Sequence, residues 1–423
     1  MEFTIIWFLL AGILLVYLVF FISFADRASR FFAKKLFQPS SQEFLAALSS
    51  TVNAPIEYED EEVEVLNSGV EFMDSLLASI AVAKHSINIT VYIWEAGEMS
   101  DLLIQTLQER AKHGVQIRIL LDSFGSSGAP HELFKTLTAS GSQVVRFRSP
   151  ALGRLTRLHR RNHRRALVID GKVGFTGGMA IADKWYKDTT YPVWRDTMFK
   201  VKGKLAQSLQ SAFVDIWTGV TGEVLVGQEY YPLGTPAAPQ GKPYIALSSS
   251  PSPDTHPLPK LFWLSLAAAQ KSIKIVTPYF IPEKFIRDIL VSQAKKGVEV
   301  TILLPGSHSD ARPVRWASQF FYSELISAGV LIYEYQPSMI HSKYMLIDDE
   351  WVVFGSANMN IRSMVRDEEN IIGTIDKKLG EALAIDFLHD TAQSIKMNKK
   401  RWTQRGIFSR AVEKLCWLFI EQF

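Results

Sequence analysis

The residues with the clearest chemical potential lie in one apolar run late in the chain. His341 is followed by Lys343 and then Asp348, and Gly355–Ser356 begins fourteen positions after the histidine. Apolar runs of this kind predict buried strands, in which alternate side chains face the same side. His341 and Lys343 should therefore point the same way. A lone histidine in such a strand is usually a hydrogen-bonded core residue.

The same set occurs a second time, which argues against a core role. His163, Arg165 and Asp170 have the same spacing, and Gly177–Gly178 begins fourteen positions after His163. Two such sets facing each other would place two imidazoles and two cations around one anion. That combination suits phosphodiester exchange, because one imidazole can attack phosphorus while the other protonates the leaving alcohol.

The two sets lie within a longer internal repeat. Residues 83–94 resemble 269–280, and residues 108–122 resemble 291–305. Each half shows a strand, a helix and another strand, and a glycine (Gly114 or Gly297) stands where the helix should end in a left-handed residue. Strands alternating with helices predict an α/β fold.

The ordered motifs resemble the phospholipase D superfamily, which carries two histidine-x-lysine-x4-aspartate motifs. Over roughly residues 60–390, stretches such as "RNHRRALVIDGKVGFTGG" and "MIHSKYMLIDDEWVVFGSAN" are similar to bacterial cardiolipin synthases. The resemblance implies two tandem phospholipase-D-like αβ halves with mixed sheets. It also implies transfer of a phosphatidyl group from phosphatidylglycerol to a second phosphatidylglycerol, with release of glycerol, through a covalent phosphohistidine.

The resemblance also assigns roles to residues. His163 is the expected nucleophile and His341 the expected acid, with Arg165 and Lys343 stabilising charge on the phosphoryl oxygens. An acidic residue some thirty positions past each histidine orients the imidazoles, and Asp196 and Glu369 stand at the matching places.

The remaining motif residues have expected supporting roles. Asp170 and Asp348 complete the catalytic sets, and they should brace the motif's own turn rather than touch substrate. Ser356 and Asn358 are candidates for hydrogen bonds to phosphate.

The chain departs from the family pattern at three points. Arg165 stands where lysine is usual, Met179–Ala180 replaces the Ala357–Asn358 of the second motif, and Asp367 stands where asparagine is frequent. A guanidinium keeps the charge and can bind phosphate through two donors, but it is larger than an ammonium. A non-catalytic lipid-binding protein with a decayed first half-site is therefore an open alternative.

Composition excludes some other classes of site. The single cysteine, Cys416, rules out an intrachain disulfide and a cysteine metal cluster. No histidine–glutamate spacing suggests a metal site. We expect no metal and no cofactor, and the net charge of +3 by itself points to no particular partner.

The N-terminal region predicts a membrane anchor. Residues 5–24 are twenty uncharged, largely apolar residues, and at about 1.5 Å per residue they would span about 30 Å, the hydrocarbon thickness of a bilayer. A cleaved signal peptide is the alternative, but the start is not basic, the apolar core is long and the stretch that follows is a poor cleavage site. Arg27, Arg30, Lys34 and Lys35 follow, and positive flanks stay in the cytoplasm. The expected location is the cell inner membrane, single-pass, with the catalytic part cytoplasmic.

The predicted domain organisation has five parts. They are the anchor and basic flank (1–35), the first half (36–225), a linker (226–245), the second half (246–395) and a basic amphipathic C-terminal helix (396–423). That helix can either pack on the domain or lie in the lipid headgroup layer.

The arginine-rich stretch 154–165 leads directly into His163. Such a stretch is usually a solvated face, but here it is expected to line the mouth of an anion site. It would attract anionic phospholipid, the expected partner together with the membrane, and it would equally attract nucleic acid. A phospholipase-D-like nuclease and a phospholipase D that forms phosphatidic acid are the alternative enzymes. The anchor favours a lipid substrate, so no nucleic acid is expected as a partner. The sequence does not indicate an oligomeric state.

Overall fold

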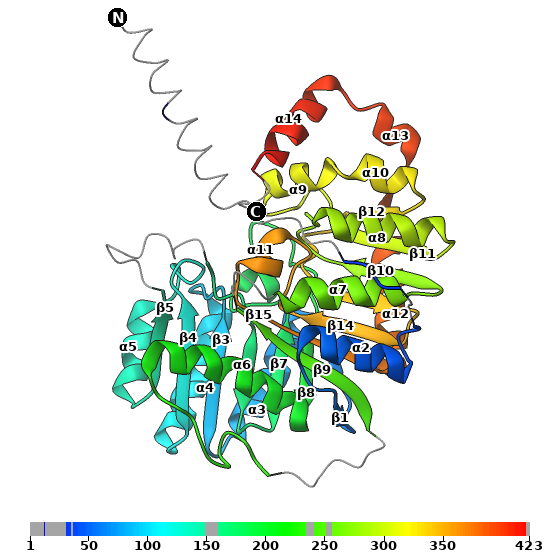
Figure 1. The fold of residues 1–423 in the computed structure, drawn as a ribbon. Coiled ribbons are helices and arrows are strands. Elements are labelled where there is room, and N and C mark those ends of the chain that lie inside the picture. Colours follow the sequence, from blue (N-terminus) through cyan, green and yellow to red (C-terminus); the bar gives the residue numbers. More distant parts are fainter. Residues whose placement is uncertain are drawn as a thin grey trace, which may run out of the picture.

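The chain forms two mixed sheets flanked by helices (Figure 1). The structure is a computed structural model, and it describes residue 12 and residues 31–34, 37–148, 160–233, 241–250 and 256–419. The predicted α/β class and the division into two similar halves are confirmed.

The sheet of the first half has seven strands in the order β2-β8-β7-β6-β3-β4-β5. Its strands are β2 (Glu64–Leu66), β3 (Ser86–Val91), β4 (Gln116–Asp122), β5 (Gln143–Phe147), β6 (Ala166–Ile169), β7 (Val173–Gly177) and β8 (Met198–Lys202). The helices of this half are α3 (Gly69–Ala81), α4 (Glu98–Lys112), α5 (His131–Ala139), the short 3-10 turn η2 (Asp183–Trp185) and α6 (Gly203–Thr221).

The sheet of the second half has nine strands in the order β1-β9-β15-β14-β13-β10-β11-β12-β16. Its strands are β1 (Glu57–Glu59), β9 (Lys242–Ser249), β10 (Ser272–Val276), β11 (Glu299–Pro305), β12 (Leu331–Tyr335), β13 (Tyr344–Ile347), β14 (Trp351–Gly355), β15 (Glu369–Ile375) and β16 (Ser394–Met397). Its helices are α2 (Gln42–Val52), α7 (Pro257–Ala268), α8 (Lys284–Lys295), α9 (Arg312–Gln319), α10 (Tyr322–Ser327), α11 (Ile361–Val365), α12 (Lys377–Ala392), α13 (Lys399–Thr403) and α14 (Ile407–Trp417).

The repeat seen in the sequence is a repeat of sheet topology. The strand order β8-β7-β6-β3-β4-β5 of the first sheet recurs as β15-β14-β13-β10-β11-β12 in the second. In both halves three parallel strands adjoin an antiparallel set. Gly114 and Gly297, which follow α4 and α8, have φ angles of 81° and 93°, as expected for left-handed residues at helix ends.

The two sheets face each other across a shared core. This core contains side chains from both sheets and from α6 and α12. At its centre Phe199 of β8 stacks on Phe354 of β14, with ring centroids 4.2 Å apart. The packing brings the segments before β6 and β13 together, and these segments carry the two histidine motifs.

The predicted N-terminal boundary of the first half is wrong. Residues 42–59 belong to the second half, because α2 packs on α7 and β1 pairs with β9 at the edge of the nine-stranded sheet. Phe44 of α2 packs edge-on against Trp351 of β14, with ring centroids 5.3 Å apart. The predicted linker also ends early, since β9 begins at Lys242.

Up to residue 419, where the described part of the chain ends, the C-terminal segment contains two helices rather than the predicted one. α13 and α14 are separated at Gln404–Gly406, and α14 packs on α9 with Trp417 stacked on Phe320 at 5.1 Å between centroids. Arg405 pairs with the buried Glu413. The opposite face of α14 leaves apolar side chains exposed, so packing on the domain uses only part of the helix.

The predicted membrane anchor falls outside the described residues, except for Gly12. In the part of the chain that the structure describes, we find no helix with the length and apolar character needed to cross a bilayer.

Candidate active site

The two histidines lie in short extended segments at the interface of the halves. We expected them within strands, but His163 and His341 each precede one, β6 and β13. The backbone N–H of His163 donates to the carbonyl of Glu368 (2.9 Å), and that of His341 donates to the carbonyl of Arg195 (2.7 Å). Each histidine segment is thus pinned to the opposite half, next to that half's orienting carboxylate.

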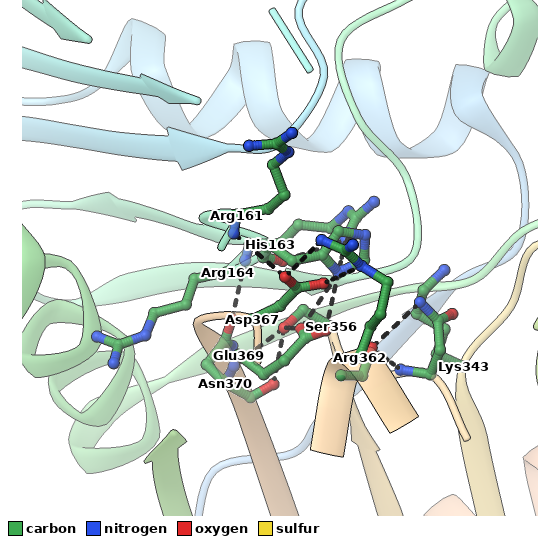
Figure 2. Close-up of polar contacts among 12 residues, drawn as sticks. Arg161, His163, Arg164, Lys343, Ser356, Arg362, Asp367, Glu369 and Asn370 are labelled. Atoms are coloured by element: carbon green, nitrogen blue, oxygen red, sulfur yellow. Dashed lines mark hydrogen bonds and ion pairs between the residues drawn. The ribbon is translucent and has the colours of Figure 1, made fainter. Parts of the chain in front are cut away.

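The orienting carboxylates are exchanged between the halves. His163 Nδ1 lies 3.0 Å from Glu369 of the second half (Figure 2), and His341 Nδ1 lies 2.9 Å from Asp196 of the first. All four side chains are buried. A carboxylate accepting from Nδ1–H leaves Nε2 as the unprotonated ring nitrogen, which a nucleophile or base requires.

A buried cation accompanies each imidazole. Lys343 Nζ lies 3.1 and 3.2 Å from the two ring nitrogens of His341 and donates to the His341 carbonyl at 2.9 Å. Arg165 Nη1 lies 3.3 Å from His163 Nδ1, and Arg165 Nε donates to the carbonyl of Met179 at 3.0 Å. Arg165 Nη2 is buried and has no hydrogen-bond partner among the described residues. A buried, unpaired guanidinium donor is costly, and an anion in the site would satisfy it.

Burial controls the charge of the imidazoles. It lowers the pKa of His163, to which Arg165 adds, and it lowers the pKa of His341 to about 3, to which Lys343 adds. Both imidazoles are therefore neutral near pH 7. Burial also brings the pKa of Lys343 well below its usual value.

Burial acts on the pKa values of the two carboxylates in the opposite direction. Burial alone raises the pKa of Asp196 and of Glu369, but the histidines that they contact outweigh it and hold both pKa values below the ordinary range. The described residues contain no group of three His, Cys, Asp or Glu side chains suited to a metal ion.

Different donors fix the two carboxylates. The Ser356 hydroxyl donates to Glu369. The equivalent position of the first half is Gly178, where a Cβ would lie 2.0 Å from Asp196 Oδ1. There the Trp185 indole N–H donates to Asp196 at 2.9 Å instead.

The two candidates for phosphate binding both have contacts within the protein. Besides its bond to Glu369, Ser356 accepts from the backbone N–H of Asn370 at 3.0 Å. Asn358 Nδ2 lies 3.4 Å from Ser363 Oγ, while its buried Oδ1 has no partner in the described part of the chain.

The motif aspartates face backbone amides rather than the imidazoles. Asp170 accepts from the N–H groups of residues 84–86 at 2.7–2.9 Å, where β3 begins. Asp348 accepts from those of residues 270–272, where β10 begins, at 2.7–3.2 Å. Both lie in left-handed turns, with φ of 51° and 55°. They tie each motif hairpin to the start of the adjacent antiparallel strand, β3 or β10, so their bracing reaches beyond the motif's own turn.

The departures from the family pattern have local explanations. The Met179 carbonyl accepts from Arg165 Nε, so the longer cation is held by the segment that replaces Ala357–Asn358. Asp367 pairs with Arg362 at 3.1 Å and accepts from the Arg161 N–H at 3.1 Å (Figure 2). An asparagine there would lack the charge that pairs with Arg362.

The described arginines of the arginine-rich stretch have different surroundings and do not form one surface. Arg164 is buried, and its Nη1 donates to the Ala212 carbonyl of α6 at 2.7 Å; Figure 2 shows its side chain leading away from His163. Arg161 lies over the Phe124 ring at 4.5 Å. Residues 154–159 lie outside the described part of the chain.

Several residues of the site were missed by the motif analysis. Aromatic rings surround the imidazoles: Tyr92 is 5.0 Å from His163, and Trp185, Trp194 and Tyr279 are 5.5, 5.6 and 6.0 Å from His341, between centroids. Trp194 stands two positions before Asp196, and that proximity was an available signal. Asn370 follows Glu369 directly and accepts from the Arg165 N–H at 2.8 Å.

Comparisons with known proteins agree with this site. A family model described as "Cardiolipin synthase, PLD-like domain" matches residues 76–217 and 264–391, and these two segments contain both histidine motifs and both carboxylates. A probable cardiolipin synthase of Bacillus subtilis, YwiE, is 30% identical over 359 residues, covering 84% of this chain and 71% of that protein. A cardiolipin synthase of Alkalihalophilus pseudofirmus is 33% identical over 354 residues, 83% of this chain and 70% of that protein.

A solved structure extends the comparison to the fold. The crystal structure of phosphatidylserine synthase from Haemophilus influenzae is similar with a TM-score of 0.69 at 16% identity, covering 90% of this chain and all of that one. At that identity the likeness concerns the fold alone, and it agrees with the arrangement in two halves. Together with the family match, these findings show that the chain belongs to the cardiolipin synthase family of phospholipase-D-like proteins.

Proposed function

We propose that the protein is a phosphatidyltransferase that joins two phosphatidylglycerol molecules into cardiolipin and releases glycerol. The observation that carries the proposal is the convergence of two neutral, carboxylate-held imidazoles with two buried cations, one of which has an unpaired donor. This set fits one phosphodiester anion, and the named activity of the relatives supplies the substrate class.

The first step forms a phosphohistidine. His163 Nε2 attacks phosphorus, the P–O bond to glycerol breaks, and His341 Nε2 protonates the departing oxygen. His341 is neutral before substrate binds, and the anionic phosphodiester then favours its protonated form. Arg165 and Lys343 stabilise the charge that builds on the phosphoryl oxygens.

The second step uses the same groups in reverse. A hydroxyl of the second phosphatidylglycerol gives its proton to His341, and its oxygen attacks the phosphorus of the phosphohistidine. The P–N bond breaks, cardiolipin leaves, and His163 is again neutral. Glu369 and Asp196 hold the rings in the tautomer that each step requires.

The proposed setting is a membrane surface. Residues 5–24 would anchor the chain, with the catalytic halves on the cytoplasmic side. The exposed apolar side chains of α14 stand beside Arg410 and Lys414, a combination that suits an anionic lipid surface.

The test is mass spectrometry of lipids and free headgroups after incubation with phosphatidylglycerol vesicles. We expect cardiolipin and glycerol in equal amounts, lost in both His163→Ala and His341→Ala and retained in the control His113→Ala, which changes an exposed histidine. Phosphatidic acid as the sole lipid product would make the protein a phospholipase D. An unchanged lipid pool would refute the proposed function.

A further inference from the structure

One cavity at the interface of the halves is not used by the mechanism above. It has a volume of about 740 Å³. Tyr191 and Trp194 of the first half line one side, and Asp310, Arg312 and Met339 of the second half are among the residues that line the other. It is therefore a product of the same packing that assembles the two imidazoles.

The cavity lies on the His341 side of the site. Trp194, which lines it, has its ring 5.6 Å from that of His341. Tyr279, whose ring is 6.0 Å from His341, donates its hydroxyl to Asp310 Oδ2 at 2.8 Å. None of His163, Arg165, His341 and Lys343 is among the residues that line this cavity. An alcohol held in the cavity would therefore reach His341 past the Trp194 ring.

We propose that this cavity is the site of the acceptor lipid, in which Asp310 binds the glycerol hydroxyls and Arg312 binds the acceptor's phosphate. The assignment rests on the proposed function and adds the position and orientation of the second substrate.

Asp310 and Arg312 suit different groups of the acceptor lipid. A carboxylate binds hydroxyl groups as an acceptor and repels phosphate, and Tyr279 occupies only part of the capacity of Asp310. The Arg312 guanidinium, two positions further along the chain, is exposed at the cavity and suits a phosphodiester. The hydroxyl end of the acceptor therefore points to His341 and its phosphate points outward.

This arrangement selects the acceptor after the phosphohistidine has formed. Water and an alcohol compete for the same phosphorus, and each gives its proton to His341. A polyol can donate one hydroxyl to Asp310 while another attacks phosphorus, which a single water molecule cannot do, and only a phosphatidyl polyol gains a further ion pair from Arg312. The cavity thus favours transfer over hydrolysis.

The experiment measures how the phosphohistidine is partitioned. The full chain receives phosphatidylglycerol vesicles and deuterated glycerol, and mass spectrometry gives two ratios: cardiolipin to phosphatidic acid, and deuterated phosphatidylglycerol to phosphatidic acid. Because each ratio compares products of one intermediate, neither depends on the amount of folded enzyme or on the rate of the first step.

The variants should separate the two roles. Asp310→Ala should lower both ratios by about tenfold or more, the value of hydrogen bonds to a charged group. Arg312→Gln should lower the cardiolipin ratio by a similar factor and the glycerol ratio by less, since free glycerol has no phosphate. The control Asp288→Ala, on the exposed face of α8, should change neither.

Wild-type ratios in both Asp310→Ala and Arg312→Gln would overturn the assignment. A wild-type enzyme that forms neither transfer product would instead refute the proposed function, and the acceptor site with it. Asp310→Asn provides a second variant of nearly the same shape, and it should also lower both ratios.

Discussion

Each imidazole of the site lies beside one carboxylate and one cation, and these two neighbours have different effects on the ring. The carboxylate fixes the ring through Nδ1, whereas the cation and the surrounding protein keep the ring neutral. A neutral imidazole is the form that attacks phosphorus, so the resting site is prepared for the first bond to form. In the proposed mechanism, the acid needed in that step forms only when the substrate anion binds.

The order of the histidines can be tested with a leaving group that needs no acid. A nitrophenyl ester of phosphatidic acid should still form the phosphohistidine in His341→Ala and release one burst of nitrophenol, because nitrophenolate departs unprotonated. On phosphatidylglycerol the same variant should lose about 10²–10⁴-fold in rate, the usual value of a general acid. His163→Ala should give no burst. The reverse pattern would exchange the two roles.

A second residue-scale prediction concerns stability at low pH. In the folded protein the pKa of His341 is lowered to about 3 by burial and by Lys343. In the unfolded chain the same imidazole binds a proton below about pH 6.5. Between these values the unfolded state holds the extra proton, so stability falls as pH decreases, by up to about 1.4 kcal/mol per pH unit.

His341→Gln removes that loss. Its thermal unfolding midpoint, measured on the full chain in detergent, should therefore fall less between pH 7 and pH 5 than that of the wild type. His113→Gln, which changes an exposed histidine after α4, should follow the wild type. Parallel curves for His341→Gln and the wild type would contradict the prediction.

At the scale of elements, the position of a carboxylate depends on a close backbone approach. At Gly178, just after β7, an added Cβ would meet Asp196 Oδ1 at 2.0 Å. Gly178→Ala should therefore displace Asp196 and, through it, His341 of the other half. We expect a loss in kcat on the order of 100-fold, as for a catalytic group displaced by about 1 Å.

The matched control is Gly219→Ala in α6, where an added Cβ meets nothing within 4 Å. It should keep full activity and gain roughly 0.5–1 kcal/mol of stability, because alanine is the better helix former. Steady-state kinetics of both variants measure the change in kcat, and thermal unfolding measures the change in stability. Full activity in Gly178→Ala would mean that Asp196 does not need its present position.

Much of this architecture could be predicted from the sequence, because a repeat shows which positions are equivalent. The spacing shared by His163 and His341 predicted two half-sites, and the two glycines predicted the ends of α4 and α8. Equivalence does not say which residues meet across the interface. The pairing of His341 with Asp196 depends on how the sheets face each other, and no local pattern encodes that.

Local patterns also failed at the edges of the halves. Residues 42–59 precede the first half in sequence, yet they complete the sheet of the second, because apolar α2 finds its partner surface on α7 and Trp351. The aromatic rings around His341 come from three separate segments. Their convergence is a tertiary event that composition alone does not reveal.

At the scale of the whole molecule, we propose that the exposed apolar side chains of α14 contact the bilayer. Phe408 and Leu415, one heptad apart on α14, are 82% and 57% exposed. We expect Phe408→Glu combined with Leu415→Glu to raise the apparent KM for phosphatidylglycerol vesicles about tenfold, since two anchoring side chains become charged. Turnover of a short-chain, monomeric phosphatidylglycerol should remain at the wild-type level.

α12 provides the matched control. Ile385 and Leu388 are likewise exposed, at 68% and 63%, and lie one turn apart. Ile385→Glu combined with Leu388→Glu adds the same charge elsewhere and should leave the KM for vesicles unchanged. Equal effects from the two pairs would point to general electrostatic repulsion from the anionic surface rather than to contact through α14.

The exchange of carboxylates between the halves has a consequence for how the two halves evolve. Since Asp196 serves His341 and Glu369 serves His163, neither copy of the duplicated unit contains a complete set of its own. A mutation near the carboxylate of one copy changes the surroundings of the histidine in the other copy. The sequences of the two copies therefore cannot change independently. Among descendants of this gene, we expect changes near residue 196 to be accompanied by changes around residue 341, some 145 positions away, more often than by changes around residue 163.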